Sequence, residues 1–259
     1  MNKRVLGLTG LAAFALASTP LAIVHADDTA TQLQSEGTVG FIANNDPHSP
    51  LNPLTPFDPD SGKQNNVEPK DGNTNSSDTR GNQLTLDYAP SFRFGTNNKI
   101  TSGAHDTIFA QALTIDDKGT TVPNYAQVTD LRDSKTSGWQ LKVTQDDDWT
   151  STSGETIAGA EIKFRNVQDA ISGQKANFAK PTTNKTVTIT KGNSVKLMNA
   201  SSSSDTASRN GYGSWMYVIG DDNNKSSSVE LNIPDNTVLS AGTYKTNLTW
   251  SLEDTGATN

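Results

Sequence analysis

Two copies of the tripeptide Trp-x-Leu, about 110 residues apart, constrain what this chain can fold into. The copies are Trp139-Gln140-Leu141 and Trp250-Ser251-Leu252, and each sits in a run in which apolar and polar residues alternate. Successive side chains of a β-strand point to opposite faces, so the Trp and the Leu share one face and the middle residue lies on the other. Each copy therefore predicts a strand, over residues 138–145 and 243–253, with one apolar face.

The rest of the chain after residue 83 follows the same alternation and predicts an all-β fold. Short runs rich in Val, Ile, Thr and aromatic residues are separated by turn residues such as Gly, Asn and Asp, a pattern typical of an antiparallel sandwich. The further expected strands are 84–94, 106–115, 124–132, 160–168, 185–190, 194–199, 214–219 and 228–233. Residues 164–176 are an exception, because Phe164, Val167 and Ile171 have helical spacing and predict a short helix.

The first 26 residues have the pattern of a secretion signal. Lys3 and Arg4 precede an apolar run over residues 5–17, and Val24-His25-Ala26 offers small residues at a cleavage site between Ala26 and Asp27. The apolar run is shorter than the roughly 20 residues that a membrane-spanning helix needs. We expect a secreted chain whose mature form, residues 27–259, is one domain without an integral membrane segment.

Charge and cysteine content exclude several classes of function. Cleavage after Ala26 leaves 19 Lys and Arg against 28 Asp and Glu, a formal net charge of −9. No cluster of basic residues is present, so we expect no nucleic-acid partner, because phosphate backbones are bound by grouped Lys and Arg. The chain has no Cys, which rules out a disulfide framework. An apolar core must therefore stabilise the fold.

Proline, Asn and Gly are concentrated in residues 44–82, which predicts a long N-terminal loop or arm. We expect residues 38–43, just before it, to form a first strand that joins the main sheet. The arm is a candidate to cover a sheet edge, where unpaired backbone groups invite association. Residues 58–62 resemble part of a calcium loop, but they lack its closing Glu and predict a polar turn instead.

Several separated features give the chain a resemblance to the WxL-domain family of Gram-positive surface proteins. They occur in the family's order and include Thr38-Val39-Gly40-Phe41-Ile42, Pro50-Leu51-Asn52-Pro53-Leu54, Leu84-Thr85-Leu86-Asp87-Tyr88, Phe92-Arg93-Phe94-Gly95, Gln127-Val128-Thr129-Asp130-Leu131-Arg132 and the two Trp-x-Leu motifs. The resemblance implies a non-catalytic module held on the cell wall, with peptidoglycan and other surface proteins as partners, including membrane-anchored ones. Residues 253–259 carry no sorting signal, so we expect non-covalent attachment.

The candidate site residues are those of the two motifs, Trp139, Leu141, Trp250 and Leu252, together with Trp149. The apolar neighbours of both motif tryptophans at two-residue spacing favour a place in the core, and contact with a ligand is the alternative. Trp149 follows Asp146-Asp147-Asp148 without such a neighbour, so we expect it to be exposed and able to stack on a sugar or a partner. Trp215 lies in a run that is apolar on both faces and predicts a central buried strand.

No catalytic or metal-binding motif stands out, so we expect neither an enzyme nor a cofactor. His48 and His105 are the histidines of the mature chain, and we interpret both as surface or capping residues. The carboxylates of residues 146–148 and Glu155 are numerous enough to supply a glycosidase pair by chance, and a solvated turn is the simpler interpretation. The competing functions are an adhesin for host matrix proteins and an enzyme acting on wall glycan.

Overall fold

The structure is a computed structural model that describes residues 36–44, 46–72, 83–101, 107–132, 138–175, 177–202 and 209–256. The chain divides into one unit at Met1–Phe41 and a second at Ile42–Asn259. The expected secretion signal, His105 and the end of the arm at 73–82 lie outside the described residues. In the described part of the chain there are strands and loops but no helix.

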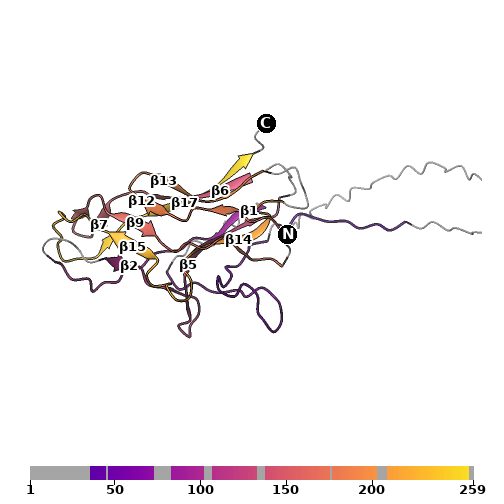
Figure 1. The fold of residues 1–259 in the computed structure, drawn as a ribbon, viewed down its shortest axis with the longest axis horizontal. Coiled ribbons are helices and arrows are strands. Elements are labelled where there is room, and N and C mark those ends of the chain that lie inside the picture. The colour runs from indigo at the N-terminus through magenta and orange to yellow at the C-terminus, as the bar shows by residue number, and fades with distance from the viewer. Residues whose placement is uncertain are drawn as a thin grey trace, which may run out of the picture. The chain divides into compact units, whose positions relative to one another are not determined.

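The described residues of the second unit form three four-stranded sheets and two smaller ones, and every pair of named strands is antiparallel (Figure 1). The central sheet has the order β1-β5-β14-β10, with bounds Leu84–Tyr88, Asn124–Asp130, Gly213–Ile219 and Ile171–Ser172. The second sheet, β11-β13-β6-β17, has bounds Thr182–Thr183, Ser194–Ala200, Gly138–Gln145 and Leu248–Gly256. The third, β12-β9-β15-β2, has bounds Val187–Ile189, Glu161–Phe164, Val229–Asn232 and Ile108–Phe109.

Two small sheets complete the set. One has the order β16-β7-β8, with bounds Tyr244–Lys245, Trp149–Ser151 and Thr156–Ile157. The other pairs β3, Leu113–Thr114, with β4, Thr121–Val122. The all-β antiparallel prediction is therefore confirmed.

The central sheet is buried on both faces, because it separates two apolar clusters. Trp215 and Tyr217 of β14 belong to the larger cluster, which also holds the inward residues of β6, whereas Met216 and Val218 belong to the smaller one. Every residue of β5 and β14 is buried. The prediction that Trp215 lies in a central buried strand is confirmed.

The proline-rich residues 46–72 fold back onto the smaller cluster. Leu51 is buried there, and its backbone N–H donates to Oε1 of Gln127 (2.8 Å) while Nε2 of Gln127 donates to the carbonyl of Ser49 (3.1 Å). Further along, the N–H groups of Glu68 and Lys70 donate to carbonyls of residues 115 and 114, at 3.1 and 2.8 Å. This segment therefore covers the free edge of β3.

The polar turn predicted at residues 58–62 is present. Oδ1 of Asp58 accepts hydrogen bonds from the backbone N–H groups of Asp60 (3.1 Å) and Ser61 (2.6 Å). These bonds lower the pKa of the Asp58 carboxyl. The carboxylate is thus committed to closing its own turn.

Two local predictions are wrong. Residues 38–43 form no strand and their apolar side chains are exposed. Residues 164–175 are not helical, because Phe164 ends β9, Val167 makes a single bridge to Ile219, and β10 begins at Ile171. Asn166, with a φ of 55°, has left-handed backbone that a right-handed helix cannot contain. Side chains three apart are buried here by a strand and a loop rather than by a helix.

Several expected strands are shorter or divided. The first ends at residue 88 instead of 94, and the run expected over 106–115 becomes β2 and β3 with a loop between them. The last is divided into β16 and β17 by residues 246–247. Loop residues 89–95 instead supply Phe92 and Phe94 to the larger cluster.

Candidate functional site

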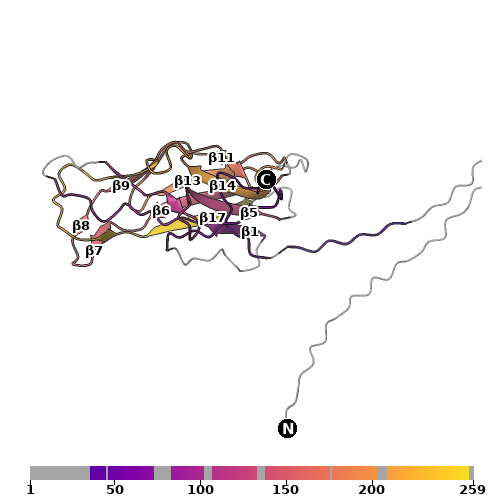
Figure 2. The ribbon, with the colours of Figure 1, turned by 90° about the horizontal axis from the view of Figure 1, so that it is seen from below.

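The two Trp-x-Leu motifs lie side by side on neighbouring strands, although they are far apart in the sequence (Figure 2). In the antiparallel pair of β6 and β17, Leu141 is opposite Leu252 and Val143 is opposite Trp250. The motifs therefore form one structural unit at the centre and edge of the second sheet. Their alternation turns the Trp and Leu side chains toward the larger apolar cluster.

Trp139 is fully enclosed. Its exposed fraction is 0%, and its indole Nε1 donates to the carbonyl of Gly211 (3.2 Å). Gly211 has a φ of +70°, and a Cβ on it would lie 2.9 Å from that indole nitrogen. The same Cβ would lie still closer to the Cβ of Ala200, so the turn at Gly211 accepts no side chain while Trp139 and Ala200 occupy their places.

Trp250 is only half-buried, because β17 is the edge strand of its sheet. Its ring centroid lies 6.3 Å from that of Phe92, which itself packs edge-on against Phe164 at 5.5 Å. Leu248 and Leu252 on the same face are half-buried as well. The second motif thus packs against the core without being enclosed by it.

Trp149 in β7 is also half-buried, so the prediction that its side chain is exposed is wrong. Its ring meets Phe94 edge-on at 5.6 Å, and its indole nitrogen is buried without a hydrogen-bond acceptor among the described residues. Phe94 comes from the loop after β1, whereas the prediction considered only apolar neighbours two residues away.

The residues between the buried motif positions form a polar surface that the sequence reasoning did not single out. We call it the outer face and define it as Gln140, Lys142 and Thr144 of β6 with Thr249, Ser251 and Glu253 of β17. Oε2 of Glu253 accepts hydrogen bonds from Nε2 of Gln140 (2.7 Å) and Nζ of Lys142 (2.8 Å). These bonds lower the pKa of Glu253, so the carboxylate stays ionised. The alternation that identified the buried face also identifies this one.

An arginine ties the central sheet to the motif strands. Arg132, just after β5, makes two hydrogen bonds to the carboxylate of Asp130 at 2.9 and 3.0 Å and donates to the carbonyl of Gly138 (3.2 Å). Its Nη1 lies 2.7 Å from Oδ2 of Asp254 in β17. The residues before the first motif therefore fix the two sheets to each other.

A buried carboxylate, that of Asp87, lies on the face of the central sheet that is turned away from the motif strands. Asp87 accepts hydrogen bonds from the hydroxyls of Thr85 and Thr129, both 2.6 Å, and from Nε2 of Gln127 (2.9 Å). Burial raises the pKa of Asp87, and these three donors oppose that rise. Because Gln127 also holds the proline-rich segment, the cluster positions that segment.

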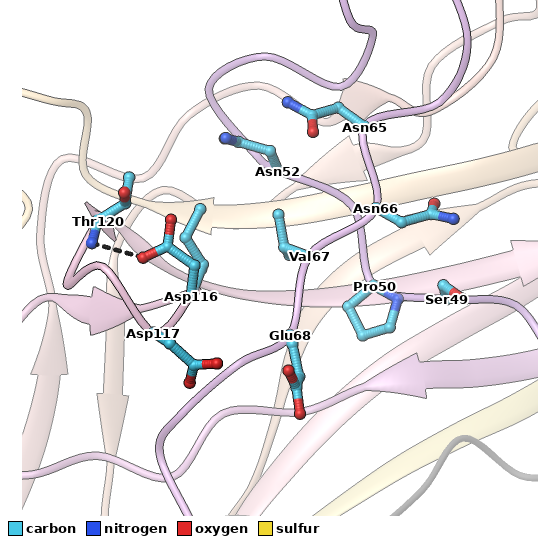
Figure 3. A pocket seen from close by; sticks show the side chains of 11 residues that line it. Ser49, Pro50, Asn52, Asn65, Asn66, Val67, Glu68, Asp116, Asp117 and Thr120 are labelled. Carbon is cyan, nitrogen blue, oxygen red and sulfur yellow. Dashed lines mark hydrogen bonds between the residues drawn. The ribbon is translucent and has the colours of Figure 1, made fainter.

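A hollow of about 590 Å³ opens between the proline-rich segment and the turn after β3, as Figure 3 shows. Asn52, Asn65 and Asn66 line one side, and the other side carries Asp116, whose Oδ1 accepts from the N–H of Thr120 (2.9 Å). Among the described residues, none that lines the hollow is aromatic. It offers hydrogen-bonding groups but no stacking platform.

The remaining candidate residues are engaged in separate contacts. Asp148 pairs with Lys191 (2.8 Å), and Asp146 accepts from the hydroxyl of Thr249 (2.9 Å). The hydroxyls of Ser151 and Ser153 bond to Glu155 and lower its pKa, which opposes a role as a proton donor. Within the ranges that the structure describes, no group of His, Asp and Glu is arranged to hold a metal ion. The same ranges contain no helix long and apolar enough to cross a membrane.

Comparison with known proteins gives one family and no individual relative. No curated protein and no solved structure matches the chain. A family model described as "WxL domain surface cell wall-binding" matches residues 28–256, a range that contains both motif strands, the central sheet and the proline-rich segment. The chain therefore belongs to the WxL-domain family of surface proteins that bind the cell wall.

Proposed function

We propose that this chain is a non-catalytic surface module that binds peptidoglycan without a covalent link, through the outer face of β6 and β17. The observation that carries the proposal is that the two faces of the motif strands differ, one apolar and packed on the core and the other polar. The aromatic and aliphatic motif residues point into the core, and the residues between them present amide, hydroxyl, ammonium and carboxylate groups on the other face of the sheet.

The chemistry of peptidoglycan suits such a surface. Its amino sugars carry acetamido and hydroxyl groups, and its peptides carry carboxylates and amides, all of which form hydrogen bonds. Lys142 has three N–H donors, of which Glu253 takes one at 2.8 Å, and Gln140 has both donor and acceptor atoms. On this proposal Trp139, Leu141, Trp250 and Leu252 act as the core behind this face, and Trp149 supports the far end of the same unit.

Co-sedimentation with sacculi stripped of protein and teichoic acid tests the proposal. The Lys142→Ala variant of residues 27–259 should bind about tenfold more weakly, since a lost hydrogen bond to a charged group is worth about 1.4 kcal/mol or more. Lys163→Ala is the matched control, because Lys163 also pairs with a carboxylate on a sheet, at 3.2 Å from Glu161, but lies in β9. Equal binding by both variants would refute the role of the outer face.

A wild-type chain that stays in the supernatant would refute peptidoglycan as the receptor.

Added salt should leave binding unchanged or strengthen it, because the mature chain carries a net charge of −9 and screening reduces its repulsion from an anionic wall. A steep loss of binding at moderate salt would contradict this electrostatic reasoning.

We propose in addition that the chain is secreted by cleavage between Ala26 and Asp27 and that it associates with other surface proteins, including membrane-anchored ones. N-terminal sequencing of the surface-released protein should give a sequence that begins at Asp27.

Immobilised residues 27–259 should retain a membrane-anchored protein from a surface extract, and that protein should bind again after purification. A zymogram on purified wall should show no clearing, and clearing would refute the non-catalytic role.

A further inference from the structure

The segment of residues 38–43 is suited to be a strand but pairs with no strand among the described residues. In residues 38–43 the side chains of Val39, Phe41 and Ile42 are 76%, 90% and 96% exposed. Among the described residues, none pairs its backbone with this segment. Contiguous exposed apolar side chains on a soluble protein commonly mark an interaction site.

An open sheet edge is present in the same chain. Strand β17, nine residues long, pairs with β6 on one side and with no strand in the described ranges on the other. Its inward side chains Trp250 and Leu252 are half-buried, whereas those of β6 are fully buried. The edge therefore has both unpaired backbone groups and incompletely covered apolar side chains.

Length favours β17 over the other edges. A six-residue strand spans about 20 Å, which fits along nine residues. Strand β1, the next longest edge, has five residues, and the edge strands β10 and β11 have two each. Among the edge strands that the structure describes, only β17 is long enough to pair with the whole of residues 38–43.

We propose that residues 38–43 of one copy add as a strand to the β17 edge of a second copy. Val39, Phe41 and Ala43 share one face of such a strand and cover Trp250 and Leu252, while Thr38 lies on the face that continues the outer face. Every copy carries both the strand and the edge, so reciprocal exchange closes a two-fold dimer.

Charge does not prevent this contact, although the chain is acidic. Glu36 and Asp46 flank the added strand, and Glu253 and Asp254 lie on β17. Both acids of β17 are already paired, Glu253 with Lys142 at 2.8 Å and Asp254 with Arg132 at 2.7 Å. Residual repulsion between the copies should be screened by salt, so the dimer should become more stable as salt is added.

The oligomeric state of residues 27–259, measured by light scattering over a concentration series, is the first test. The wild type should form a dimer, and Phe41→Asp should be monomeric. Val238→Asp is the matched control, because Val238 is 93% exposed yet lies far from residue 41 in the sequence and outside every strand, so this variant should stay dimeric. A wild type that is monomeric at the highest soluble concentration, or a Phe41→Asp dimer, would overturn the proposal.

Cysteine trapping locates the contact, since the chain has no Cys of its own. A Thr38→Cys chain mixed with a Ser251→Cys or Thr249→Cys chain should give a disulfide-linked heterodimer on oxidation, and mixing with Val238→Cys should not. If neither β17 variant exceeds that control, the proposed edge is wrong. If Thr38→Cys and Ser251→Cys in one chain close as a monomer, the strand pairs within its own copy, and the exchange is refuted.

The dimer extends the proposed wall binding without depending on it. The strand adds beside β17, whereas the proposed wall contact uses the sheet's outer face. Phe41→Asp should therefore still pellet with sacculi, and Gln140→Ala, an outer-face variant that keeps the pair of Lys142 and Glu253, should still form the dimer. Failure of one proposal can thus be distinguished from failure of the other.

Discussion

Replacing Trp139 by alanine should destabilise the fold strongly, because this side chain is fully enclosed. Truncation of a buried Trp or Phe typically costs about 3 to 5 kcal/mol. The change also leaves the carbonyl of Gly211 without the indole donor that lies 3.2 Å away, which places the expected cost near the upper end of that range. Such a loss is a large fraction of the roughly 5 to 15 kcal/mol that keeps a typical domain folded.

Trp250→Ala provides the matched comparison within the same motif. Trp250 is half-buried and its indole makes no hydrogen bond among the described residues, so the expected cost is roughly half as large, about 1.5 to 2.5 kcal/mol. Urea unfolding followed by far-UV circular dichroism, with a common slope for all variants, measures both free energies of unfolding.

Two results would refute this reasoning. The first is a Trp139→Ala variant whose free energy of unfolding lies within about 1 kcal/mol of the wild-type value, since removal of an enclosed Trp typically costs more than that. The second is a variant of normal stability that no longer pellets with sacculi. The first result would mean that Trp139 is not part of the core, and the second would in addition make it a ligand contact.

Three further perturbations test other parts of the fold by the same unfolding assay. Gly211→Ala should cost about 2 kcal/mol or more, because φ is +70° and the new Cβ meets the indole of Trp139; a neutral effect would contradict the tight turn. Leu51→Ala should cost about 2 to 4 kcal/mol because Leu51 is 1% exposed, whereas Leu54→Ala, at 37% exposure, should cost less than about 1 kcal/mol; equal costs would mean that the proline-rich segment is not docked. Burial raises the pKa of Asp87 in the folded state above 3.8, so ionisation of this carboxyl opposes folding. As the pH rises from about 4 through the folded-state pKa, the wild type should therefore lose stability relative to the Asp87→Asn variant. A difference in stability that does not depend on pH would refute the shift.

Local alternation was enough to predict β6 and its buried face. In β6 the side chains of Trp139, Leu141 and Val143 are all 0% exposed, and the residues between them are half-buried. The period of two is a property of one strand, so it can be read without knowing what lies beside it. The pairing of β6 with β17 could not be read in this way, because it depends on contacts across more than 100 residues.

Partners distant in the sequence explain the predictions that failed. Phe94 covers Trp149 from a loop about 55 residues earlier, and Gln127 of β5 holds Leu51, which lies 76 residues before it. The helical spacing of Phe164, Val167 and Ile171 reflects a buried strand end and a loop packed on the same core. Residues 38–43 have the sequence of a strand but no partner strand among the described residues, and sequence alone does not say whether the partner belongs to the same copy.

The central claim is that the wall is bound by the outer face of β6 and β17, with the motif tryptophans behind it. The most direct test is a titration of ¹⁵N-labelled residues 27–259 with soluble peptidoglycan fragments, followed by amide chemical shifts. The account predicts that the largest shifts fall on Gln140, Lys142, Ser251 and Glu253. Shifts confined to the hollow beside Asn65 and Asp116, or to the β7 end around Trp149, would contradict it.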